Sequence, residues 1–463
     1  MSDTDLREVL AGVDWGLSTS VSLAATSGGS PDFVLSDSSR RWSMDLAAVL
    51  GRTPTSCQLV AGWPYLQPTR PGHWDRAVLD RCDRRLDQLL DRGIKPGVTL
   101  LHVDMPRWAD QSGGWLDRDT ASRFADFAAG MGERFGDRVS RWTTVSDVLV
   151  HSVADYVAGM LPTGRGVGMR GLVALHHVLL GAGLAVRALR QTASGAEVGG
   201  SLTVIGGYAA SDDIEDYIAL ERLESWAHRL LLDPMLLGRH MVAEGGRSPV
   251  EDSGCVRPGD MEAIAEPADV LGVVWHVPTR VAAPENLARL LPVRECFSAL
   301  NDANRVLARL GFVLAPMEAV QTNRYGWPVV PEALADAVAA LHDIYGDALP
   351  SLRIIDNGMY DLDPASDTDE ERDRRQAGLT AQLKWLARVM AEGVEVSGYE
   401  YWSLMDNAPW KLRYTRHYAM AADNRQYPPQ PAIPRDWPHQ PAFGGPPPAG
   451  RAAKPGRRAL YSV

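Results

Sequence analysis

Short apolar runs rich in β-branched residues alternate with amphipathic helical patterns along most of this chain. That alternation is typical of repeated βα units, which build a parallel sheet. The sequence therefore predicts an α/β fold with strands at residues 13–18, 57–62, 98–103, 141–146, 198–205, 270–274, 352–355 and 396–402.

Helical periodicity is clearest between residues 75 and 92. One face of this segment is apolar, the opposite face carries Arg and Asp, and Gly93 supplies a helix stop. The predicted apolar face consists of Leu79, Cys82, Leu86, Leu89 and Leu90. Further helices are predicted at residues 172–189 and 377–392, the latter ended by Gly393.

Composition narrows the classes of partner. The chain has 463 residues, 45% of them hydrophobic, and a formal net charge of -11. A single α/β barrel can have this length. An acidic chain whose Arg and Lys residues are scattered through helices lacks the basic surface that follows a phosphate backbone. We expect no nucleic-acid partner, and a small neutral or cationic molecule as substrate.

The four cysteines indicate a reducing compartment. Cys57, Cys82, Cys255 and Cys296 show no metal-ligand spacing, so we expect free thiols, no metal and no cofactor. The adjacent His176 and His177 fall in a helical pattern and cannot both face one metal ion. The N-terminus has no apolar leader, and no stretch approaches eighteen apolar residues, so we expect a soluble cytoplasmic protein without a membrane partner.

The C-terminal 37 residues differ in composition from the rest. From Tyr427 onward they contain ten prolines and end with several Arg and Lys residues. Such a segment cannot supply the backbone hydrogen bonds or apolar area of a domain. We predict one domain over residues 1–426 and a Pro-rich basic extension over residues 427–463, and the pattern leaves a homo-oligomer open.

Two aspartates at predicted strand ends carry the candidate chemistry. Asp147 ends the motif WTTVSD at residues 142–147, and Asp356 lies within IIDNG at residues 354–358. These motifs resemble T-F-N-E-P and I-T-E-N-G of family 1 glycoside hydrolases, the β-glucosidases and their relatives. In that family each motif carries a catalytic glutamate, so both acids here are one methylene shorter.

The resemblance extends over residues 15–423. It includes LHVDMP at residues 101–106, RFGDRV at residues 134–139 and the segment from Gly398 to Asn407. It implies a single (β/α)8 barrel whose active site lies at the carboxyl ends of the strands. Fold does not decide function, so each pocket position must be considered in turn.

Several positions that hold the sugar ring in the family are changed. His102, Trp402 and Trp410 match the family, whereas Leu23 stands in place of a Gln, Ser146 of an Asn and Pro409 of a Glu. An unpaired buried hydroxyl costs roughly 1–3 kcal/mol, so three such losses oppose recognition of an ordinary glucoside.

The surroundings of the second acid are changed too. Gln58 takes the position of an Arg, His276 that of a Tyr, and Val274 that of an Asn. We expect His276 to act with Asp147 and Asp356, and Gln58 to orient Asp356. Loss of the neighbouring cation favours a raised pKa for Asp356, and a protonated His276 would oppose that rise.

The two shorter side chains bear on mechanism. Retaining glycosidases hold their carboxyl groups about 5–5.5 Å apart and inverting enzymes about 6.5–9.5 Å apart. Two missing methylenes widen the gap by roughly 2 Å, which favours the inverting range over direct nucleophilic attack.

Three functions remain open. The first is a repurposed enzyme that applies acid/base catalysis to a less polar molecule, by dehydration, elimination, isomerisation or cyclisation. The Ala-, Arg- and Gly-rich composition is typical of high-GC actinobacteria, where such recruitment into specialised metabolism is common. The second is glycoside hydrolysis with altered specificity and an inverting mechanism. The third is a non-catalytic, ligand-binding barrel in which the aspartates are structural.

Overall fold

A computed structural model gives the fold. It describes residues 3–24, 37–102, 104–157, 159, 165–243, 246–286, 304, 307–315, 317, 320, 328–355, 357 and 368–402. Within these residues eight parallel strands close into a barrel in which neighbours follow chain order. The strands are β1 (Asp14–Ser22), β2 (Ser56–Val60), β3 (Lys95–Leu101), β4 (Arg141–Val145), β5 (Glu197–Thr203), β7 (Val270–Val274), β10 (Ser351–Ile355) and β11 (Val396–Trp402).

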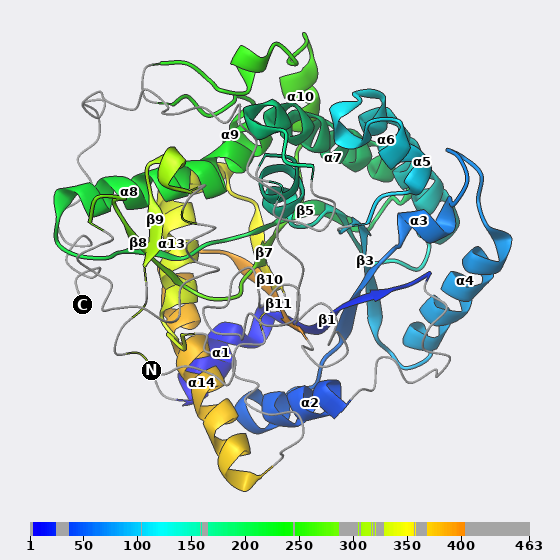
Figure 1. Cartoon of the computed structure of the whole chain (residues 1–463). Helices are drawn as coiled ribbons and strands as arrows, with labels where there is room; N and C mark the ends of the chain where they lie inside the picture. The colour runs from blue at the N-terminus through cyan, green and yellow to red at the C-terminus, as the bar shows by residue number, and fades with distance from the viewer. Residues whose placement is uncertain are drawn as a thin grey trace, which may run out of the picture.

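Helices surround the strands and bury their outer faces (Figure 1). The longer ones are α2 (Asp37–Leu50), α4 (Arg76–Leu90), α6 (Asp119–Phe135), α7 (Leu172–Thr192), α8 (Ile214–Glu224), α9 (Leu230–Leu237), α13 (Ala333–Tyr345) and α14 (Asp369–Ala391). Shorter helices are α1 (Asp3–Val9), α3 (Trp63–Leu66), α5 (Arg107–Gln111) and α10 (Asp260–Ile264). The (β/α)8 barrel expected from the resemblance is confirmed, and each of the eight predicted strands is present.

Local sequence explains where the helices begin. Asp75 caps α4 by accepting a hydrogen bond from the backbone N–H of Val78. The buried stripe of α4 includes Val78, while Leu90 is exposed, so the predicted apolar face was wrong at that end. Helix α14 begins eight residues before the predicted start, because Thr368 and Glu371 form a capping box.

Helix α7 is apolar on nearly every side because it is enclosed. It packs against α6, α10 and the barrel strands β4 and β5. By length and composition the segment Gly168–Thr192 could cross a membrane, and it is the one such helix in the described part of the chain. However, 78% of its apolar window is buried inside the fold, as expected of a core helix.

A small second sheet lies beside the carboxyl ends of β5 and β7. Its strands are β6 (Gly207–Ala209), β8 (Thr279–Ala282) and β9 (Val313–Ala315). Strand β6 follows β5 after three residues, and β8 follows β7 after four. This sheet therefore flanks the barrel mouth on the side where Asp147, Thr203 and His276 lie.

Candidate active site

Asp147 lies just beyond the carboxyl end of β4 in an uncommon backbone conformation. Its φ is 56°, and it is the only non-glycine residue with positive φ in the described part of the chain. A side chain in this left-handed region costs roughly 1–2 kcal/mol, although Asp tolerates it better than most residues. Such strain persists where the surroundings hold the residue in place, and it is typical of functional sites.

Two hydroxyl groups of β5 hold this turn. Thr203 donates a hydrogen bond to Oδ1 of Asp147, and Ser201 donates one to the hydroxyl of Ser146 over 2.9 Å. Ser201 and Thr203 are two residues apart, so both face the barrel interior. The other carboxylate oxygen of Asp147 lies 3.6 Å from Nε2 of His102 at the end of β3. Asp147 is thus buried between two neighbouring strands.

These neighbours keep Asp147 ionised. Burial by itself would raise the pKa of its carboxyl group. The His102 imidazole, with smaller contributions from His276 and the Thr203 hydroxyl, outweighs burial and lowers the pKa to about 2. Asp147 is therefore a carboxylate at neutral pH, able to accept a proton or stabilise a cation.

His276 lies two residues beyond the end of β7 and belongs to the same electrostatic group. Burial lowers the pKa of His276, and repulsion from His102 lowers it further. The Asp147 carboxylate raises it, but by less than burial lowers it. At neutral pH His276 is therefore an uncharged imidazole. The sequence predicted His276 beside Asp356; in the described residues its charged neighbours are Asp147 and His102.

Gln58 lies inside the barrel, where its amide joins a polar network. It donates hydrogen bonds to Thr99 over 2.9 Å and Thr143 over 3.2 Å, and accepts one from Arg141 over 2.9 Å. The predicted contact of Gln58 with Asp356 lies outside the described residues. The contacts that are described connect it to the strands below the site.

Below Gln58 an ionic network crosses the barrel interior. Glu400 on β11 accepts hydrogen bonds from Arg141 on β4 and from Nε of Arg353 on β10. Arg353 also contacts Asp14 on β1. Glu400, Arg353 and Arg141 are at most 4% exposed. Two cations face two carboxylates, so this layer closes the barrel beneath the candidate site without net charge.

Glycines on neighbouring strands make room for these side chains. A Cβ at Gly97 would overlap the amide of Gln58, and one at Gly398 would overlap the guanidinium of Arg353. Cys57 also lies in this buried region, and burial raises the pKa of its thiol to about 12. It is therefore an unreactive thiol, in agreement with the absence of a base at suitable sequence spacing.

The remaining predicted site residues fall in three groups. Leu23 is 1% exposed and packs in the hydrophobic core, and its N–H donates to the carbonyl of Val60. Val274 is fully buried at the end of β7, opposite Thr203 in the strand register. Outside the described residues lie Asp356, Pro409, Trp410, the side chain of Trp402 and the extension over residues 427–463.

Sequence reasoning missed Ser201 and Thr203. Both are polar residues at alternate positions near the end of a correctly predicted strand, and β5 neighbours β4 in a barrel of chain-order strands. That combination is a usable signal for a group facing Asp147. No set of three His, Cys, Asp or Glu residues in the described ranges is arranged to hold a metal ion.

Comparisons with known proteins agree with the barrel and its motifs. The family model "Glycosyl hydrolase family 1" matches residues 19–436. A bifunctional β-D-glucosidase/β-D-fucosidase of Bifidobacterium breve is 31% identical over 402 residues, covering 84% of this chain and 83% of the relative. The thermostable β-glucosidase B of Thermobispora bispora is 31% identical over 394 residues, covering 84% and 76%.

Solved structures give the same result. The psychrophilic β-glucosidase BglU of Micrococcus antarcticus superposes with a TM-score of 0.67 at 25% identity, covering 87% of this chain and 91% of that enzyme. With a family match over most of its length, relatives above 30% identity and the closed barrel, this chain belongs to glycosyl hydrolase family 1.

Proposed function

We propose that this chain catalyses general acid/base chemistry on a small molecule less polar than a glucoside. In this proposal Asp147 stays a carboxylate throughout, and His102 and His276 donate and accept the protons beside it. The observation that carries the proposal is the environment of Asp147, which is buried, hydrogen-bonded by Thr203 and flanked by His102.

A standard retaining β-glucosidase needs a protonated carboxylic acid at this position. A carboxyl group whose pKa is lowered below its usual value is almost entirely ionised at neutral pH. Glycosidases raise the pKa of their general acid by burial, whereas here the neighbours lower it. Asp147 is therefore better suited to stabilise a positive charge than to protonate a leaving oxygen.

The two histidines supply what Asp147 lacks. A carboxylate orients a neighbouring imidazole and stabilises its protonated form, which can donate a proton. A second, neutral imidazole can accept one. In a dehydration or elimination, one side chain protonates the departing oxygen and the other removes a proton from carbon. Cyclisation and isomerisation need the same pair, and none of these reactions requires a cofactor. Asp356, the second retained acid, is the further candidate group.

A second candidate function is glycoside hydrolysis with altered specificity. The relative from Bifidobacterium breve is a β-D-fucosidase as well as a β-D-glucosidase. A fucoside is a deoxysugar and so needs one polar partner fewer, which suits a pocket in which Leu23, Ser146 and Pro409 replace polar family residues. In this alternative Asp356 activates water on the far side of the sugar.

The two candidates separate in one experiment. The full chain is incubated in deuterium oxide with a mixture of terpenoid, aromatic and sugar-derived alcohols, and products are identified by mass spectrometry. We expect at least one compound to lose water or gain deuterium at carbon. The Asp147→Asn variant should lose this activity without a large change in thermal stability, and Asp104→Asn, an exposed acid two residues from His102, is the matched control.

Chromogenic β-D-glucosides and β-D-fucosides give the opposing outcome. Turnover of either by the wild-type chain, abolished by Asp147→Asn, would overturn the proposal in favour of hydrolysis. Binding of compounds without any product would indicate a non-catalytic barrel. Restoring glutamate at positions 147 and 356 together should not create glycosidase activity, because the changed sugar-binding positions remain.

A further inference from the structure

A chain of buried titratable groups lies outside the barrel, apart from the candidate active site. Nε2 of His176, on α7, lies 2.8 Å from Oδ2 of Asp260, the first residue of α10. Nδ1 of His176 lies 3.1 Å from Nε2 of His240, in the segment between α9 and α10. All three residues are at most 3% exposed. The chain therefore connects α7 to both ends of the segment from Gly238 to Gly259.

Hydrogen-bond chemistry determines where the protons are. The Asp260 carboxylate only accepts, so Nε2 of His176 carries a hydrogen and its Nδ1 is an acceptor. His240 must then donate from Nε2, which leaves its own Nδ1 as an acceptor. That Nδ1 atom is buried without a hydrogen-bond partner in the described residues. Both imidazoles are neutral in this arrangement.

The charged groups around Asp260, His176 and His240 already neutralise one another. Asp260 accepts hydrogen bonds from Nη1 and Nη2 of Arg118, which precedes α6, and from the backbone N–H of Arg257 over 2.8 Å. The other titratable neighbours are Cys255 and His177, whose Nδ1 lies 2.9 Å from the carbonyl of Trp115. Among the described neighbours of His176 and His240, no unneutralised anion is therefore left to compensate an added proton.

Protonation is costly while these hydrogen bonds stay formed. One added proton places an N–H at Nδ1 of His240, where no acceptor lies, at a cost of about 1–3 kcal/mol. A second proton would go to Nδ1 of His176, whose N–H would then point at the N–H on Nε2 of His240. In agreement, burial lowers the pKa of His176 and lowers that of His240 to about 4.

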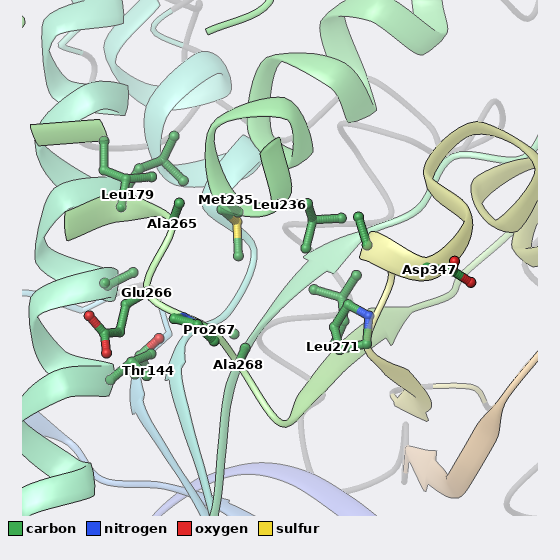
Figure 2. Close-up of a pocket in the computed structure, with 17 residues that line it drawn as sticks. Thr144, Leu179, Met235, Leu236, Ala265, Glu266, Pro267, Ala268, Leu271 and Asp347 are labelled. Carbon is green, nitrogen blue, oxygen red and sulfur yellow. The ribbon is translucent and has the colours of Figure 1, made fainter. Parts of the chain in front are cut away.

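A pocket borders two of the helices that these hydrogen bonds join. A cavity of about 280 Å³ lies between α7, α9 and the residues that follow α10 (Figure 2). Its lining is largely apolar and includes Leu179, Met235 and Leu271. Thr144 lines it from β4, so the cavity lies on the outer face of the barrel rather than at the site of Asp147. Beside it α10 packs closely on α7, because a Cβ at Gly183 would overlap the carbonyl of Ala263.

A left-handed glycine lies at each end of the connecting segment. Gly238 ends α9 with φ 63°, and Gly259 precedes α10 with φ 87°. Left-handed glycines at these points allow the segment to leave without strain in the adjoining helices.

We propose that the chain from Asp260 through His176 to His240 is a pH-operated latch. Neutral histidines hold the described residues around His240 and Asp260 against α7, and protonation on acidification releases them. The latch is independent of the reaction proposed above, and it makes the outer layer of the barrel responsive to pH.

Hydrogen–deuterium exchange of the full chain at pH 7.5 and pH 5.5 tests the latch, after correction for the intrinsic exchange rate. An opened His240 titrates near pH 6.5 and a latched one near pH 4, so opening should become about tenfold more favourable at pH 5.5. Peptides covering residues 238–262 should lose about that much protection, while peptides from β10 and α14 should not.

Variants separate the latch from general acid sensitivity. His240→Gln can still donate to His176 but does not titrate, so the segment should stay protected at both pH values. His240→Ala should be unprotected at both, and His73→Gln, an exposed histidine, should behave as the wild type. Equal protection of the wild type at both pH values would overturn the proposal, as would an unchanged acid response in His240→Gln. Ring ¹⁵N spectra must also show hydrogens on Nε2 and none on Nδ1 in both histidines.

Discussion

Replacing Glu400 by leucine should destabilise the barrel strongly. Its Oε1 accepts hydrogen bonds from Arg141 and Arg353, and Glu400 is fully buried. Arg353 keeps a second partner in Asp14, but the nearest carboxylate left for Arg141 in the described part of the chain is that of Asp14, at 3.9 Å. Removing one partner of a buried ion pair leaves an uncompensated charge, which costs about 3–5 kcal/mol.

This free energy converts to a measurable melting shift. A folded region of about 400 residues has an unfolding entropy of roughly 0.8 kcal/mol/K, so Tm should fall by about 4–6 °C. Thermal unfolding followed by circular dichroism at one scan rate, together with guanidinium unfolding, measures the loss. The control is Glu395→Leu, at an exposed position just before β11, which should change the free energy of unfolding by less than about 0.5 kcal/mol.

A double variant tests the cause of the loss. Glu400→Leu combined with Arg141→Met removes the orphaned cation, so the pair should recover more than half of the stability lost by Glu400→Leu alone. A loss below about 1 kcal/mol in Glu400→Leu would refute the reasoning, because the buried network would then contribute little. Simple additivity of the two single variants would refute it as well.

Three further outcomes follow from the site and its support. Thr203→Val removes a hydrogen bond to an ionised carboxylate, so the pKa of Asp147 should rise by about one unit in a ¹³C-carboxyl titration, and Thr203→Ser should restore it. The pKa of Asp147 is lower in the folded than in the unfolded chain, so its ionisation stabilises the fold above about pH 4, and this stabilisation is lost as pH falls towards 2. In Asp147→Asn, the free energy of unfolding should therefore lack this pH-dependent part. Gly97→Ala should displace the amide of Gln58 and lower Tm. At Gly72 a Cβ would meet open space but φ is +70°, so Gly72→Ala should cost only the backbone strain.

Parts of the candidate site were accessible from sequence because they are local. Asp147 directly follows a predicted strand and His102 lies near the end of another, and parallel strands bring their carboxyl ends to one edge. Their proximity, 3.6 Å between Nε2 and Oδ2, follows from β3 and β4 being neighbours. The role predicted for Gln58 did not take account of Arg141, because nothing at position 141 of the sequence indicates that its side chain turns inward.

The sequence by itself determined the alternation of strands and helices, the family and the positions of the motif acids, since periodicity and motifs are properties of short segments. Only the tertiary structure decided which side chains meet. Arg141 and Glu400 are 259 residues apart, and His176 and Asp260 are 84 apart. Their contacts depend on barrel closure and strand register, which no local pattern records. The same closure brings His102 and Thr203 to Asp147, where both lower the pKa of its carboxyl group.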